Sequence, residues 1–154
     1  MAAREMAAWA SLLTTLVVWV PYAAFVLRQV NGGAPDSGAI MGAFIGAVVY
    51  SVVLSIVIAV ALAVVTRGAV DTPADEREQL ISLRATDAAY TVLTVGVLVV
   101  ALCMPAVAMG RLELFPGYPA SDTALVAANG VLATVVVAEL IRAGLQIARY
   151  RLDL

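Results

Sequence analysis

The sequence contains no histidine and no lysine, and Cys103 is its single cysteine. Without histidine, imidazole metal sites, histidine-ligated haem and histidine general-base catalysis are excluded. Without lysine there is no Schiff-base chemistry, and one cysteine forms neither an internal disulfide nor a dithiol redox pair. Carboxylates, hydroxyls and arginine remain, with no convincing nucleophile and base pair among them. We therefore expect a protein that is not an enzyme and holds no cofactor or metal.

Charge is also scarce. Only 13% of the 154 residues are charged and 63% are hydrophobic, whereas a soluble domain has about 25% charged and about 45–50% apolar residues. This composition excludes a soluble domain, and its high hydrophobicity excludes disorder. The net charge of −2 argues against a nucleic-acid partner, which needs a clustered basic surface. The composition predicts an integral membrane protein surrounded by lipid.

Four apolar runs are long enough to cross a bilayer, which takes about 20 residues. Because lipid offers no hydrogen-bond partner to the backbone, each run should be an α-helix. The connections between the runs are short and leave no room for a second domain. We expect an all-α four-helix bundle that forms one transmembrane domain over residues 1–154, with spans at about 7–27, 39–66, 88–109 and 124–146.

The arginines predict the orientation, because basic residues gather on the cytoplasmic side of a membrane. With the N-terminus in the cytoplasm, only Arg28 and Arg111 lie on the opposite side. The arginines on the cytoplasmic side are then Arg4, Arg67, Arg77, Arg84, Arg142, Arg149 and Arg151. We therefore expect both termini in the cytoplasm of a bacterial cell, with the chain in its cytoplasmic (inner) membrane.

A charged segment precedes the third span. Thr72 is a good helix N-cap and Pro73 suits the first helical position. The acids that follow favour the positive end of a helix. The pattern predicts that the third helix begins near Pro73 in the cytoplasm and enters the membrane without a break. Its exposed start is a candidate surface for docking a protein partner, formed by Asp75, Glu76, Arg77 and Glu78.

Polar residues follow helical spacing in the third and fourth spans. Leu80, Arg84, Asp87, Thr91, Thr94 and Leu98 share one face of the third helix, and Glu139 and Arg142 are an i,i+3 pair on the fourth. Since these helices run antiparallel, Asp87 and Arg142 fall at similar depth. We expect Arg84, Asp87, Glu139 and Arg142 to form one cluster of alternating sign. Such a cluster is either a structural clamp, the interpretation we prefer, or an ion or proton path.

Other polar residues inside the spans are candidates for lining a path. Hydroxyls in membrane helices also bond to carbonyls of their own helix, and an amide there commonly bonds to a neighbouring helix. These two structural roles are alternatives to lining a path. The candidates for a polar path are Tyr50, Ser51, Ser55, Thr91 and Asn129.

Gly42 and Gly46 form a GxxxG motif in the second span. Small residues at this spacing let helices approach closely. We expect them to pack against another helix of the same chain, with a homo-oligomer as the alternative. Cys103 is expected to be a small buried residue, since a soft-metal site needs several sulfur ligands.

The segment Asp75 to Glu78, followed by Arg84 and Tyr90, resembles a family of uncharacterised small bacterial four-helix membrane proteins. Members carry Asp-Glu-Arg-Asp/Glu before their third span, and many have an acid, an arginine and a basic tail in their last span, as Glu139, Arg142 and Arg151 do here. The resemblance covers the second half of the chain. It implies the architecture and no activity or catalytic residue.

Two functions fit these observations. The first is a non-enzymatic regulatory or interaction subunit that docks partners on its cytoplasmic face, and this is the one we prefer on sequence alone. The alternative is a small oligomeric channel or transporter with a polar path at Glu139 and Asp87. A dry interior would favour the first function, and a polar cavity that reaches Glu139 would favour the second.

Overall fold

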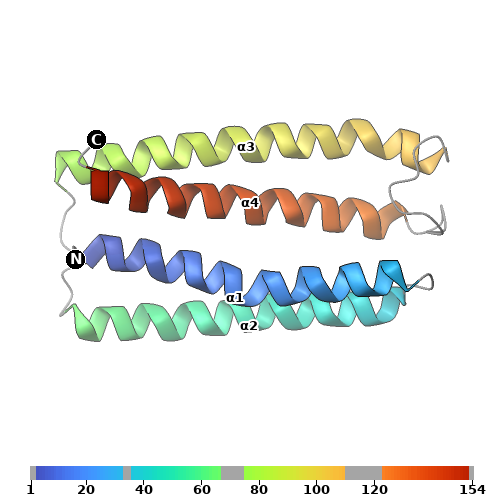
Figure 1. Cartoon of the computed structure of the whole chain (residues 1–154), viewed down its shortest axis with the longest axis horizontal. Helices are drawn as coiled ribbons and strands as arrows, with labels where there is room; N and C mark the ends of the chain where they lie inside the picture. The colour runs from blue at the N-terminus through green and yellow to red at the C-terminus, as the bar shows by residue number, and fades with distance from the viewer. Residues whose placement is uncertain (1–2, 33–35, 67–74, 110–122, 153–154) are drawn as a thin grey trace.

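The computed structural model describes residues 3–32, 36–66, 75–109 and 123–152, which form four long helices (Figure 1). The helices run antiparallel, so both termini lie at one end of the molecule, here called the termini end, opposite the far end. All four are long and apolar enough to cross a membrane. The expected all-α four-helix architecture is confirmed, and the helices are α1 (Ala3–Asn31), α2 (Ser37–Val65), α3 (Glu76–Ala108) and α4 (Thr123–Leu152).

The helices form a row in the order α3, α4, α1, α2 (Figure 1). The inner helices α1 and α4 pack against each other, and each packs against one edge helix. The edge helix α2 is the least buried of the four, since Ile40 is its one buried residue. Most apolar side chains of the edge helices therefore remain on the outside of the protein, as expected where lipid rather than water is the solvent.

The start of α3 differs from the prediction. Asp75 has extended backbone angles (φ −60°, ψ 154°), and its carboxylate accepts a 2.8 Å hydrogen bond from the Glu76 N–H. The helix described thus begins at Glu76 with Asp75 as its N-cap, where we had expected a start near Pro73. Thr72 and Pro73 lie outside the described residues, as do Arg67 and Arg111. From Glu76 the helix continues without a break to Ala108.

Small residues bring α3 and α4 close together. A Cβ added at Gly96 would lie 2.5 Å from Cγ2 of Thr134, and one added at Gly130 would lie 3.2 Å from Cγ2 of Val100. Ala85 on the same side of α3 is fully buried. In a membrane, such close approach provides the packing and interhelical contacts that water-driven burial provides elsewhere.

The GxxxG motif of α2 has no such role. Gly42 and Gly46 are exposed, and a Cβ added at either would meet no atom within 4 Å. The expectation that they pack within the chain is wrong, because α2 turns Ile40 rather than the glycines inward. The glycines that are packed closely are Gly96 of α3 and Gly130 of α4.

Charged side chains link α1 to α3 and to α4 at the termini end. Arg4 on α1 forms a 3.0 Å ion pair with Glu78 on α3. Arg151 on α4 forms a 3.1 Å ion pair with Glu5, and its guanidinium lies 5.4 Å from the ring centre of Trp9. Glu5 is only 8% exposed, so its charge is balanced where water is scarce. These contacts fix the register of α1 against α3 and α4.

Candidate functional site

A polar groove of about 500 Å³ lies between α1, α2 and α4. Along α1 it extends from Ala7 to Trp19, a length of about 18 Å at 1.5 Å per residue. Its remaining wall is apolar and includes Ile58, Leu62 and Val135. The side chains that give the groove its polar character are Ser11, Thr14, Thr15, Ser51, Ser55, Glu139 and Arg142.

The charged group of the groove is an ion pair on α4. Nε and Nη2 of Arg142 lie 3.1 and 2.8 Å from the same oxygen of Glu139, Oε2. The pair therefore makes no use of Oε1, the second carboxylate oxygen. The side chain of Glu139 is 43% exposed and that of Arg142 37%, so the pair borders open space. The expected i,i+3 pairing of Glu139 with Arg142 is confirmed.

Glu139 lies near the middle of α4. It lies 13 residues before the last residue of the helix and 16 after the first, which is about 20 Å from the termini end of the helix. A carboxylate near the middle of a membrane-spanning helix is costly without water or a partner. Arg142 is such a partner, and the side chain of Glu139 also borders the groove.

The threonines of the groove are held by their own helix. Thr14 Oγ1 donates to the Ala10 carbonyl at 2.8 Å, and Thr15 Oγ1 donates to the Ser11 carbonyl at 3.0 Å. Their hydroxyl hydrogens are thus committed, while the oxygen lone pairs remain as acceptors. The sequence offered a signal for these residues that we did not use: Ser11, Thr14 and Thr15 share one face of α1 at helical spacing.

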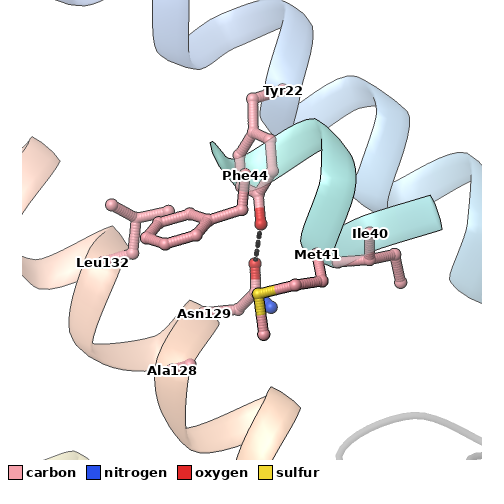
Figure 2. A pocket seen from close by; sticks show the side chains of 7 residues that line it. All are labelled: Tyr22, Ile40, Met41, Phe44, Ala128, Asn129 and Leu132. Carbon is pink, nitrogen blue, oxygen red and sulfur yellow. Dashed lines mark hydrogen bonds between the residues drawn. The ribbon is translucent and has the colours of Figure 1, made fainter. Parts of the chain in front are cut away.

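An aromatic cluster lies where the groove ends, next to a second, apolar groove of about 300 Å³ between α1 and α4 that Trp19, Tyr22 and Asn129 line. The Tyr22 hydroxyl donates a 2.7 Å hydrogen bond to Oδ1 of Asn129, which joins α1 to α4 (Figure 2). The ring centroids of Trp19 and Phe44 lie 5.8 and 6.2 Å from that of Tyr22. Beside this bond, Met41 and Phe44 line a pocket of only about 50 Å³. The interhelical use of Asn129 is confirmed.

The structure does not bring the four predicted charges together. Ile81, Ala85 and Ala89 form the buried face of α3, and Arg84 and Asp87 are exposed on the other side of this helix. The prediction of one cluster is wrong, because α3 turns its small residues, not its polar stripe, toward α4.

The five candidates for a polar path do not all lie in the groove either. Ser51 and Ser55 line the groove. Tyr50 is 54% exposed and points outside it. Thr91 lies on the exposed face of α3, where its hydroxyl donates to the Asp87 carbonyl at 3.0 Å, and Asn129 belongs to the cluster where the groove ends. Two of the five candidates therefore contribute to the groove.

The predicted docking surface is partly used within the chain. Asp75 caps α3, and Glu78 is paired with Arg4. Glu76 and Arg77 are exposed on the first turn of the helix. The surface available to a partner is therefore smaller than the sequence indicated.

No protein-family model, curated protein or solved structure matches this chain. The proposed function therefore rests on the geometry and the lining of the groove.

Proposed function

We propose that this chain is a small membrane transport protein that passes a small cation, H⁺ included, through the groove between α1, α2 and α4. Glu139 is the carboxylate that receives the cation. One observation carries the proposal: an open groove with hydroxyl groups in its otherwise apolar wall reaches the carboxylate of Glu139 near the middle of α4, a helix long and apolar enough to cross a membrane. Ionisable groups at that depth are expensive and commonly serve transport.

The chemistry of the groove favours a cation. Hard cations take oxygen ligands, and the groove offers Oε1 of Glu139 together with the hydroxyls of Ser51 and Ser55. Arg142 keeps the carboxylate neutralised while no cation is bound. An arriving cation replaces the guanidinium at the carboxylate, so the negative charge is never left without a partner.

The groove provides access from one side. It extends from near the termini end to Trp19. Beyond Trp19 lie the hydrogen bond between Tyr22 and Asn129 and a second, apolar groove of about 300 Å³, and we infer that this half is closed to water and ions. The arginine distribution favours a chain in a bacterial inner membrane with its termini end on the cytoplasmic side and the start of α3 extended into the cytoplasm. The closed half then faces outward, and transport requires the aromatic cluster to open.

Flux through liposomes tests the proposal. The purified protein is reconstituted, and proton flux is followed with an enclosed pH-sensitive dye and potassium flux with an ion-selective electrode. We expect wild type to pass at least one of these cations and Glu139→Gln to reduce that flux by roughly tenfold or more. The control is Glu76→Gln, which removes an exposed acid outside the groove and should retain wild-type flux.

Two results would contradict the proposal. One is wild-type flux of both cations no greater than that of empty liposomes. The other is equal flux in wild type and Glu139→Gln.

A second candidate is docking of a regulatory partner at the termini end. The exposure of Glu76 and Arg77 on the first turn of α3 favours it. Replacement of both by alanine should then abolish co-purification of one defined partner while cation flux is unchanged. A partner that still binds the double variant would contradict this second candidate.

A further inference from the structure

The outward face of α3 carries a pattern that the groove does not use. Leu80, Arg84, Asp87, Thr91, Thr94 and Leu98 follow alternating steps of four and three residues, the seven-residue period of helices that wind around each other. All six side chains are exposed. They lie on the side of α3 opposite its contact with α4, and α3 is an edge helix of the row (Figure 1).

The two charges on this face lack partners in the part of the chain that the structure describes. Arg84 and Asp87 follow the first residue of α3 by 8 and 11 residues, so they lie about 12 and 16 Å along a helix of about 50 Å. Both charges therefore lie just before the expected third span, which begins at about residue 88, and so at the membrane boundary. Charged side chains there have fewer water contacts than in solution, so an oppositely charged surface that covers them stabilises them.

We propose that a second copy of this chain covers this face, with α3 against α3 in a parallel two-fold dimer. The charges are self-complementary, since a two-fold axis along the bundle sets Arg84 of each copy beside Asp87 of the other. Two reciprocal ion pairs result. Deeper in the membrane Thr91 and Thr94 present small side chains, whose hydroxyls are already bonded to their own helix, so the two backbones can approach closely. Both copies insert with the same orientation, which makes the pair parallel.

Disulfide formation between copies tests the geometry in the reconstituted full-length protein. Cys103 is first replaced by serine, which leaves no other cysteine. Thr94→Cys then places a thiol on the proposed interface, and Val53→Cys places one on the exposed face of α2. Under mild oxidation we expect covalent dimers from Thr94→Cys at a rate roughly tenfold or more above that of Val53→Cys. Equal rates from the two variants would overturn the proposal.

Charge reversal tests the pairing. Single-molecule photobleaching in lipid vesicles at fixed protein-to-lipid ratio reports the fraction of dimers. Arg84→Asp should weaken the dimer by roughly tenfold or more, because four acids then meet. Adding Asp87→Arg to the same chain restores opposite charges and should restore the dimer. A monomeric wild type, an undiminished dimer in Arg84→Asp, or a double variant no better than the single would each overturn it. No transport measurement enters either test, so the dimer and the proposed cation flux stand or fall separately.

Discussion

The two sides of α4 differ in what they do with neighbouring helices. Toward α3, Gly130 and Thr134 meet a helix so close that Gly96 has no room for a Cβ. On roughly the opposite side, Glu139 and Arg142 border a groove of about 500 Å³. α4 is thus packed closely against α3 through small residues on one side and borders an open groove on the other.

The two edge helices, α3 and α2, also differ in how closely they are packed. α3 is held along a closely packed side with three buried residues, whereas Ile40 is the one buried residue of α2. We therefore expect α2 to be the helix that changes position when the groove widens or closes, since local opening follows low burial. α3 and α4 serve as the fixed frame.

The largest effect on stability is expected on the closed side. Gly96→Ala introduces a Cβ 2.5 Å from Thr134 Cγ2, so α3 and α4 must separate, at a cost of about 1–3 kcal/mol. The same change at Gly46 meets open space and should be neutral or stabilise by up to about 1 kcal/mol through helix propensity. Unfolding in mixed detergent micelles measures both variants. Equal stability of the two variants would contradict the close packing of α3 on α4.

A smaller effect is expected on the open side. Arg142→Gln leaves Glu139 without its partner near the middle of α4. Both side chains border the groove, with Glu139 43% and Arg142 37% exposed. We therefore expect the free energy of unfolding to fall by about 1–2 kcal/mol, less than the 3–5 kcal/mol lost when a fully buried pair is broken. The same unfolding assay measures it, and the double variant with Glu139→Gln should recover most of the loss. No recovery would show that Arg142 acts through packing rather than charge.

The smallest effect is expected at the closure of the groove. Tyr22→Phe removes the 2.7 Å hydrogen bond to Asn129 and keeps the ring. Interhelical hydrogen bonds in membranes contribute about 0.6 kcal/mol on average, so stability should fall by about that amount. Cation flux in liposomes should rise, because the closure weakens. A variant with lower flux than wild type would contradict the role of Tyr22 in closing the groove.

The sequence predicted what depends on local spacing and on the bilayer. Run lengths predicted four helices, and the i,i+3 spacing predicted the pair of Glu139 with Arg142. The N-cap of α2 is local in the same way, since the Asp36 carboxylate accepts from the Gly38 and Ala39 N–H groups at 2.8 and 3.1 Å. These features need no knowledge of how one helix is turned toward another.

What the sequence left undetermined is the rotation of each helix. The prediction that Arg84 and Asp87 face inward rested on the similar depth of Asp87 and Arg142 on antiparallel helices, and similar depth does not determine which face a helix turns toward its neighbour. In lipid the contact face is marked by small residues instead, and Ala85, Ala89 and Gly96 carried that signal on α3. The groove was missed for a related reason: its hydroxyls come from α1 and α2, and only the packing of three helices brings them to Glu139.

The central claim is that water and small ions reach the middle of the protein between α1, α2 and α4. In a chain with Cys103→Ser, Ser51→Cys and Tyr50→Cys place thiols at neighbouring positions of α2, the first lining the groove and the second outside it. The measurement is the rate of modification by a charged, membrane-impermeant thiol reagent applied from the termini side. A polar groove predicts that Ser51→Cys reacts roughly tenfold or more faster than Tyr50→Cys, because a thiol facing lipid stays protonated and inaccessible. Equal rates at the two positions would contradict the groove, and with it the proposed transport function.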